Sequence, residues 1–149
     1  MLEEQIKKDL KTAMLAGDVA RTETLKMVKS ALLYKAVELG VRETGLSDDQ
    51  VIDVLTKEAK KRHEASEMYT KAGRNVQAEA EKAELKIISE YLPKQASDEE
   101  INAVIDDVIS AMNDVSLQQM GQIIGAVKSK LGATADGSRV ASLVKEKLS

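Results

Sequence analysis

A segment near the C-terminus, KSKLGATADGSR from Lys128 to Arg139, has the residues of an anion-binding turn. It places a short flexible turn and several bases before and at the start of an expected helix. Backbone amides in the first turn of a helix lack partners within the helix, so they can hold phosphate oxygens. Arg139 falls in that first turn, where its positive charge opposes the helix dipole and an anion would relieve the mismatch. The segment is therefore a candidate phosphate-binding turn, although its spacing alone slightly favours a plain turn.

A plain turn with a solvated arginine is the alternative explanation of the same residues. Asp136 would cap the amides itself, and its carboxylate would repel a phosphate. The segment also lacks the glycine-rich lysine motif of nucleotide-hydrolysing proteins, so nucleotide hydrolysis is not indicated. Lys145 and Lys147 follow at the expected end of the last helix, where the helix dipole favours cations with or without a partner.

Two glycines inside the expected sixth helix, Gly121 and Gly125, are the second unusual feature. A glycine in a helix interior costs about 1 kcal/mol relative to alanine, so a compensating role is expected at both positions. We predict close packing against a neighbouring helix, with the approach of a ligand to the helix backbone as the alternative. The four-residue spacing also occurs in membrane helix dimers, but the glutamines around these positions argue against an apolar bilayer segment.

The third expected helix carries a basic run, KEAKKRH from Lys57 to His63, whose charge is typical of a nucleic-acid patch. The spacing favours a different interpretation, because Glu58 and Arg62 lie four residues apart on the apolar side and are expected to form an ion pair. His63 has no acid or nucleophile at a telling spacing, so we expect a surface side chain. Three tyrosines are the only aromatic residues, which leaves little for stacking on single-stranded bases.

Helices must position all of these residues, because apolar residues recur at helical spacing along almost the whole chain. No segment alternates between apolar and polar residues as a strand would. The first two apolar stripes extend to Met14 and Leu39. With their capping residues, the seven expected helices run from Leu2 to Gly17, Asp18 to Gly40, Ser47 to Gly73, Asn75 to Tyr91, Ser97 to Met112, Ser116 to Gly132 and Asp136 to Leu148.

Two helix starts and one proline give the chain its expected organisation. Ser47 and Ser97 each stand three residues before a glutamine or glutamate, which is the spacing of a capping box. Pro93, the only proline, cannot donate a hydrogen bond to a helix and is the best candidate hinge. We therefore predict an all-α helical-bundle protein, with a four-helix domain at residues 1–96 joined by a proline-containing hinge to a three-helix domain at residues 97–149.

Composition excludes several kinds of chemistry. The 149 residues include no cysteine and a single histidine, so thiol nucleophiles, thiolate zinc sites, iron-sulfur clusters and multi-histidine metal sites are all ruled out. We expect no catalytic residues, no metal and no cofactor. The net charge is -3, and it is unevenly distributed. Residues 97–127 hold six acids and no base, whereas residues 128–149 hold five bases and two acids.

The N-terminal sequence, MLEEQIKK, lacks the basic start and the apolar stretch of a secretory signal. No window approaches the roughly 18 apolar residues that a membrane span needs. The sequence therefore predicts a cytoplasmic protein with no membrane partner.

The arrangement resembles the YqeY family, the free-standing relatives of the C-terminal portion of the amidotransferase B subunit. The likeness covers essentially the whole chain. It depends on the four helices before YLP at residues 91–93, on MGQIIG at residues 120–125 and on GATADGSRV at residues 132–140. The glycine-bearing helix and the turn that follows it are the most specific part, whereas the helical half is more generic.

The resemblance implies a role beside an enzyme that uses glutamine as amido donor to correct misacylated glutamyl- or aspartyl-tRNA, a carbon-nitrogen ligase whose chemistry lies in other parts. This chain would correspond only to the helical and tail domains, which help to position the tRNA. Ligase activity would therefore belong to the relatives rather than to this chain. The phosphate contacts that the resemblance implies are Lys128, Lys130, Gly132, Gly137, Ser138, Arg139, Lys145 and Lys147.

Two hypotheses follow for function. The first is a non-catalytic accessory protein that contacts tRNA, or a tRNA-processing or aminoacylation complex, through the C-terminal helices. The overall acidity implies weak binding or the help of a partner, because neutralising phosphates normally takes a dense basic face. The second is a helical protein-protein interaction module without direct RNA contact. An enzyme acting alone is a third and weaker option.

Overall fold

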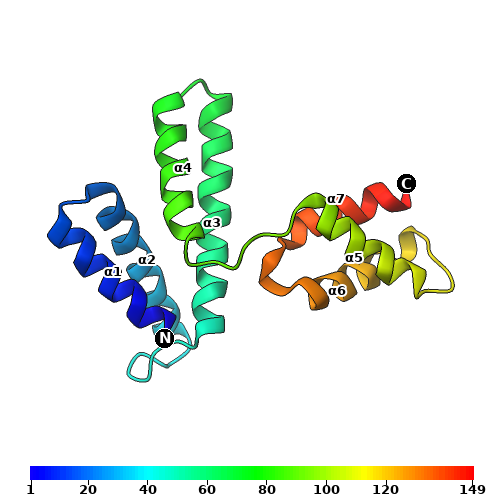
Figure 1. Ribbon diagram of the computed structural model, residues 1–149, viewed down its shortest axis with the longest axis horizontal. Helices are drawn as coiled ribbons and strands as arrows, with labels where there is room; N and C mark the ends of the chain where they lie inside the picture. The colour runs from blue at the N-terminus through cyan, green and yellow to red at the C-terminus, as the bar shows by residue number, and fades with distance from the viewer. The chain divides into compact units, whose positions relative to one another are not determined.

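The computed structural model describes all 149 residues and is built from helices alone (Figure 1). The predicted all-α fold class is therefore confirmed. The helices are α1 (Leu2–Ala16), α2 (Val19–Glu38), α3 (Asp48–Lys71), α4 (Asn75–Ser89), α5 (Asp98–Ser110), α6 (Met120–Leu131) and α7 (Gly137–Leu148), with two short 3-10 turns, η1 (Leu117–Gln119) and η2 (Gly132–Thr134).

Helix starts follow the capping residues that the sequence indicates. The Ser47 and Ser97 side chains each accept a hydrogen bond from the backbone N–H three residues on, and both capping boxes are complete. Asp18 caps α2 by accepting from the Arg21 N–H at 3.1 Å. Ser116 caps the turn η1, so α6 itself begins only at Met120.

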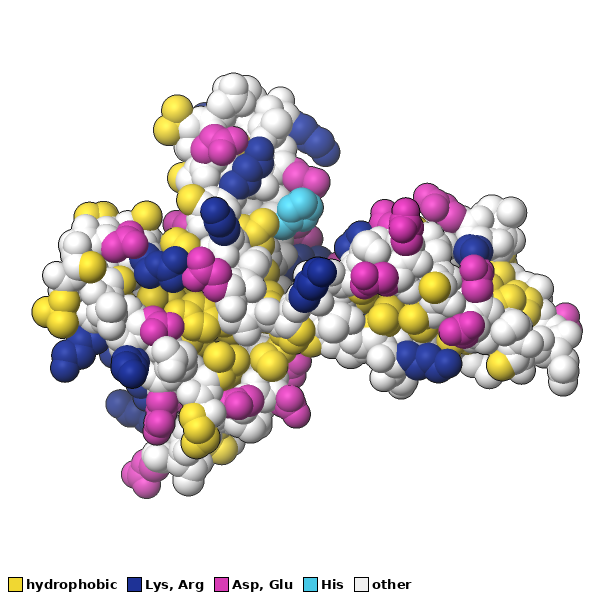
Figure 2. Space-filling model, in the orientation of Figure 1, with side chains coloured by type: hydrophobic (Ala, Val, Ile, Leu, Met, Phe, Trp, Pro, Cys, Tyr) yellow, Lys and Arg dark blue, Asp and Glu magenta, His cyan; other side chains and the backbone are white.

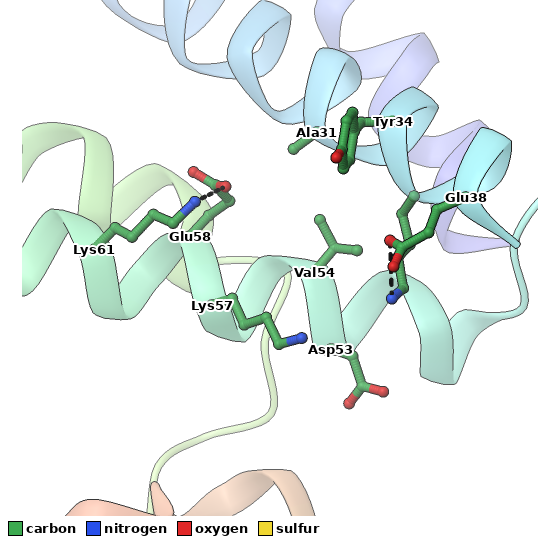
Figure 3. Close-up of a pocket in the computed structure, with 9 residues that line it drawn as sticks. Ala31, Tyr34, Glu38, Asp53, Val54, Lys57, Glu58 and Lys61 are labelled. Atoms are coloured by element: carbon green, nitrogen blue, oxygen red, sulfur yellow. Dashed lines mark hydrogen bonds and ion pairs between the residues drawn. The ribbon is translucent and has the colours of Figure 1, made fainter.

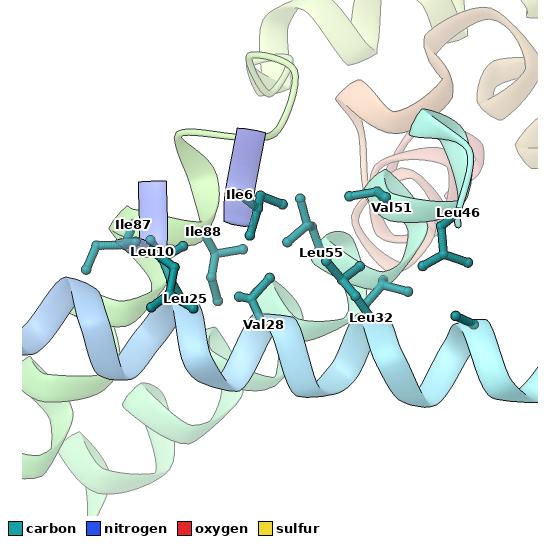
Figure 4. Close-up of a cluster of buried hydrophobic side chains, with 12 residues drawn as sticks. Ile6, Leu10, Leu25, Val28, Leu32, Leu46, Val51, Leu55, Ile87 and Ile88 are labelled. Carbon is teal, nitrogen blue, oxygen red and sulfur yellow. The ribbon is translucent and has the colours of Figure 1, made fainter. Parts of the chain in front are cut away.

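The chain divides into two compact units, Met1–Leu92 and Pro93–Ser149. The first unit contains α1 to α4, whose inward-facing apolar side chains form one core (Figure 4). Met14 and Leu39, at the ends of the first two apolar stripes, are exposed. The buried face of each of these helices therefore ends before the predicted stripe does. The core is formed by Ile6, Leu10, Leu25, Val28, Leu32, Ala36, Leu46, Val51, Val54, Leu55, Ile87 and Ile88.

Two polar contacts tie the C-terminal end of α4 to α1 and α2. Arg21 donates to both carboxylate oxygens of Glu90, at 2.8 and 3.1 Å. The Tyr91 hydroxyl donates to Asp9 at 2.6 Å. Burial and this hydrogen bond raise the pKa of Tyr91, whereas the bond from Arg21 lowers the pKa of Glu90. These contacts fix the place where the chain leaves the first unit.

An ion-pair cluster joins α3 to α4, and it differs from the predicted pairing. Arg62 contacts Glu81 at 3.2 Å and Glu84 at 3.5 Å, both on α4, whereas Glu58 pairs with Lys61 at 3.3 Å. The expected pair of Glu58 and Arg62 is therefore wrong. Arg62 instead supplies a long-range contact, which helical spacing within α3 cannot show.

The second unit closes α5, α6 and α7 around its own core. Ala96 belongs to this unit, because it is buried and its N–H donates to the Thr134 carbonyl at 2.7 Å. The Gln95 side chain donates to the Ala133 carbonyl at 3.1 Å. The segment before α5 is thus held against η2. The core consists of Ala96, Ile101, Ile105, Val108, Ile123, Val127, Ala135, Val140, Leu143 and Val144.

Replacing Glu90→Gln should weaken the first unit in a pH-dependent way. The pKa of Glu90 is lower in the folded chain, so its ion pair stabilises the fold above the ordinary glutamate value of 4.5 and is lost as the pH falls through and below it. At neutral pH the variant should lose about 1 kcal/mol or less, because solvent screens a half-exposed pair. The difference from the unchanged protein should shrink steadily as the pH falls below 4.5, because the Glu90 carboxylate is then protonated and the ion pair is lost.

Denaturant titrations followed by tyrosine fluorescence measure this effect, because Tyr34, Tyr69 and Tyr91 all lie in the first unit. Glu64→Gln is the matched control, since Glu64 is an exposed carboxylate on α3 of the same unit and has no ion pair. A stability difference that stays constant from pH 7 to about pH 3 would contradict the assigned role of the Arg21 contact.

Candidate nucleic-acid interface

The candidate phosphate contacts all lie on α6, η2 and α7 of the second unit. Folding sorts the cations among them into three groups: those that bind protein carbonyls, those that pair with carboxylates, and those that remain free. On the face shown in Figure 2, basic and acidic side chains are interspersed and no basic patch appears. The second unit as a whole holds six basic and eight acidic residues.

Lys128 closes the turn that follows α6. Its ammonium donates to the Gly132 carbonyl at 3.1 Å and to the Ala135 carbonyl. Carbonyls at the end of a helix have no partner within it, so a cation placed there stabilises the turn. Gly132 adopts φ +57°, the left-handed region that a residue with a side chain enters only under strain. Both residues therefore have a structural role in this turn.

Arg139 holds the start of α7 against the start of α5. Its guanidinium forms an ion pair with Asp98, with Nε at 2.6 Å, and donates to the Ala96 carbonyl at 3.1 Å. We call this set of contacts the Arg139 clasp. The predicted mismatch between Arg139 and the helix dipole is thus relieved by a carboxylate of the protein itself, which is the role that the sequence analysis gave to an external anion.

The remaining tail lysines behave differently from one another. Lys147 forms an ion pair with Asp106 of α5. Lys130 and Lys145 are exposed and have no ion pair. The acidic stretch and the basic tail that the sequence separates therefore neutralise each other across two ion pairs, and only two of the predicted cations are available to a ligand.

The N-terminus of α7 begins at the capping residue that the sequence predicts, but the predicted capping hydrogen bond is absent. Asp136 stands at the capping position, but its side chain accepts no hydrogen bond from the first turn. Gly137 is the first residue of α7, and Ser138 follows it as an exposed residue. The expectation that Asp136 caps the first-turn amides with its side chain is therefore wrong.

Gly121 and Gly125 do not pack against another helix, contrary to the predicted packing role. Both are exposed, and a Cβ added at either position would meet no atom within 4 Å. The helix backbone is bare along this side of α6, where Gln122 and Ser129 are also exposed. We call these four residues the α6 outer face. It carries no charge. Gln122 and Ser129 supply polar groups that were not predicted from the sequence, although Gln122 lies three residues before Gly125 and Ser129 four residues after it, which is helical spacing.

A hollow of about 460 Å³ lies between α2 and α3 of the first unit (Figure 3). Its apolar wall includes Ala31, Tyr34 and Val54. Ion pairs stand at its rim, with Lys35 and Glu38 at 3.4 Å on α2. The hollow has three lysines and three carboxylates among its lining residues, so it presents no net charge to an ionic ligand. None of the candidate phosphate contacts lines it, whereas Lys57, Glu58 and Lys61 of the basic run on α3 do.

His63 lies on the surface, as the sequence predicts, and its Nε2 is 3.3 Å from Glu67 Oε1 one turn along α3. No helix of the chain is both long enough and apolar enough to cross a membrane.

Replacing Gly125→Ala should stabilise the second unit by about 0.5–1 kcal/mol, because alanine is the better helix former and the space for its methyl group is open. Gly121→Ala should gain less, since Gly121 lies in the first turn of α6. Amide hydrogen exchange of α6, read by mass spectrometry, measures the change. A destabilised Gly125→Ala variant would mean that the helix packs there after all.

Replacing Arg139→Gln should destabilise the second unit by about 1 kcal/mol, because it removes the Arg139 clasp. The matched control is Lys130→Gln, which removes an exposed cation without a partner and should change stability by less than about 0.5 kcal/mol. Faster amide exchange in α5 and α7 of the Arg139 variant is the expected signal. Equal exchange in both variants would be inconsistent with a structural role for Arg139.

Comparison with known proteins gives three fungal relatives, each named altered inheritance of mitochondria protein 41, mitochondrial. The protein from Kluyveromyces lactis is 30% identical over 129 residues, covering 84% of this chain and 68% of the relative. The protein from Lachancea thermotolerans is 30% identical over 109 residues, covering 72% and 57%. The protein from Vanderwaltozyma polyspora is 29% identical over 111 residues, covering 73% and 59%. This chain thus spans between 57% and 68% of the length of these relatives.

The names of these relatives overturn the expectation of a cytoplasmic protein, because each is described as mitochondrial. That expectation depended on the lack of a secretory signal and of a membrane span. A secretory signal and a membrane span are both unrelated to import into mitochondria. Their absence therefore does not support a cytoplasmic location.

The model of one protein family, described as Yqey-like protein, matches residues 3–148. The match includes the helices of the first unit, the glycine-bearing α6 and the turn before α7. It agrees with the resemblance carried by MGQIIG and GATADGSRV. This chain belongs to the YqeY family.

Proposed function

We propose that this protein is a non-catalytic accessory that contacts tRNA through the α6 outer face of its second unit. The observation that carries the proposal is the bare helix backbone at Gly121 and Gly125. Each glycine weakens α6 by up to about 1 kcal/mol, and no contact within the chain compensates for that loss. A partner that needs close access to the helix backbone gives both glycines a function.

The chemistry of the α6 outer face suits the sugar-phosphate backbone of a folded RNA. Structured RNA is recognised largely through its shape and through its phosphates and 2′-hydroxyls, which bond well to neutral polar groups. Gln122 and Ser129 offer such groups beside the glycines. The family's relation to the tRNA-positioning part of the amidotransferase B subunit supports tRNA as the RNA concerned. A shape-based contact also explains how an acidic unit binds RNA without a basic patch.

The ion pairs of the second unit set a limit on the electrostatic part of this binding. Of the predicted phosphate contacts, only Lys130 and Lys145 remain as free cations, because Lys128, Lys147 and the Arg139 clasp hold groups of the protein itself. Each neutralised phosphate contributes about -0.7 to -0.9 to the slope of log K against log salt. We therefore expect a slope no steeper than about -2, from two contacts.

The decisive experiment replaces both glycines with alanine and measures binding to bulk tRNA across a salt titration. The double variant should be more stable than the unchanged protein and should bind tRNA at least about tenfold more weakly, a loss of about 1.4 kcal/mol. Loss of tRNA binding together with a gain in stability would indicate that the glycines contact tRNA, because a misfolded variant would lose stability. Ser142→Ala on α7 is the matched control, because it also improves helix propensity at an exposed position but leaves α6 unchanged.

Unchanged tRNA affinity in the double glycine variant would contradict the proposal. Charge reversal is best confined to Lys130 and Lys145, since reversing Lys128 or Arg139 would also break contacts of the fold. Glutamine-dependent amidation of misacylated tRNA by the purified chain would contradict the non-catalytic part.

A helical protein-protein module is the second candidate, and one observation favours it. Gly121, Gly125 and Ser129 form a stripe of small residues at four-residue spacing, which also permits close approach of a partner helix. This candidate predicts no binding to bulk tRNA even at low salt. The salt titration of the unchanged protein therefore separates the two.

A further inference from the structure

The turn between α1 and α2 presents an unusually apolar exposed segment. Residues 13–20 read AMLAGDVA, and Asp18 is the only charged residue among them. All of residues 14–20 are exposed. Met14, Leu15 and Val19 are 56%, 82% and 72% exposed. We call these three side chains the apolar tip, and in Figure 2 apolar side chains gather at the free end of this hairpin, at the left edge of the view.

Two backbone amides of this turn and its one carboxylate already have hydrogen-bond partners. The Gly17 N–H donates to the Met14 carbonyl at 3.3 Å, and the Asp18 N–H donates to the Ala13 carbonyl at 3.0 Å. Asp18 accepts from the Arg21 N–H, and its carboxylate lies 3.7 Å from the Arg21 guanidinium. These two amides and the Asp18 carboxylate therefore keep their partners within the protein when the turn leaves water, which lowers the cost of burying them.

Two lysines without ion pairs precede the apolar tip on the face of α1 that carries Leu15. Lys8, Lys11 and Leu15 follow the three-and-four spacing of one helix face, and both lysines are exposed without an ion pair. At 1.5 Å per residue, Lys11 lies about 6 Å and Lys8 about 10 Å along the axis from Leu15. Apolar groups of peripheral proteins enter about 5–10 Å into the boundary between headgroups and acyl chains. A tip inserted to that depth would bring both ammonium groups among lipid phosphates.

We propose that the apolar tip docks this protein on the surface of an anionic phospholipid bilayer. The lysines supply attraction to the negative headgroups, and the tip supplies apolar contact with the acyl boundary. RNA fits this surface less well, because three exposed aliphatic side chains offer nothing to phosphates or base edges. The sequence analysis expected no membrane partner because no segment spans a bilayer, but docking on the surface requires no span.

Co-sedimentation of the full chain with vesicles tests the proposal. Vesicles of phosphatidylcholine with phosphatidylglycerol provide the anionic surface, and pure phosphatidylcholine vesicles provide the neutral one. At low salt the protein should bind the anionic vesicles at least about tenfold more tightly, because each lysine near the surface contributes a several-fold gain. Replacing Lys8→Gln and Lys11→Gln together should remove most of that preference.

The double variant Leu15→Gln and Val19→Gln should bind anionic vesicles about tenfold more weakly, because it removes most of the apolar tip. Glutamine is a good helix former and both positions are exposed, so circular dichroism should show unchanged helicity. Leu33→Gln with Val37→Gln is the matched control, since these residues are exposed apolar side chains on α2 away from the tip. This control should bind vesicles as the unchanged protein does.

Three results would overturn the proposal. The first is failure of the unchanged protein to sediment with anionic vesicles. The second is equal vesicle binding by the tip variant and the unchanged protein, or equal losses in the tip and control variants. The third is loss of tRNA binding, with vesicle binding retained, in the tip variant, which would assign this surface to RNA instead.

Discussion

The Arg139 clasp is the contact on which the account of the second unit depends. It joins the first turn of α7 to the first turn of α5 and to the Ala96 carbonyl just before it. With the pair of Lys147 and Asp106, it places the basic tail against the acidic helix. The same contacts close the three-helix unit and remove cations from its surface. A ligand of the α6 outer face therefore meets an uncharged surface on an acidic unit, and shape must contribute more to recognition than charge.

Much of the fold could be predicted from local sequence. Ser47, Ser97 and Asp18 mark helix starts because their side chains bond to amides only three residues away. Apolar spacing likewise identifies the buried face of each helix, since the geometry of a helix repeats every few residues. The sixth helix is a partial exception, because Ser116 caps a 3-10 turn and α6 begins at Met120.

The candidate site was less predictable, because its contacts join residues far apart in the chain. Arg139 and Asp98 are 41 positions apart, and no spacing rule connects them. The interpretation of Gly121 and Gly125 as packing residues failed for a related reason. Helical spacing shows that two glycines share a face, but only the fold shows whether another helix covers that face. The pairing of Arg62 with α4 in place of Glu58 illustrates the same limit.

Nuclear magnetic resonance of the full 16.2 kDa chain, titrated with bulk tRNA, tests the central claim most directly. We expect the largest shifts of backbone amide signals along the α6 outer face, at Gly121, Gln122, Gly125 and Ser129, with smaller shifts near Lys130 and Lys145. Shifts concentrated at the start of α7 around Arg139, or an α6 outer face unaffected by saturating tRNA, would contradict the claim.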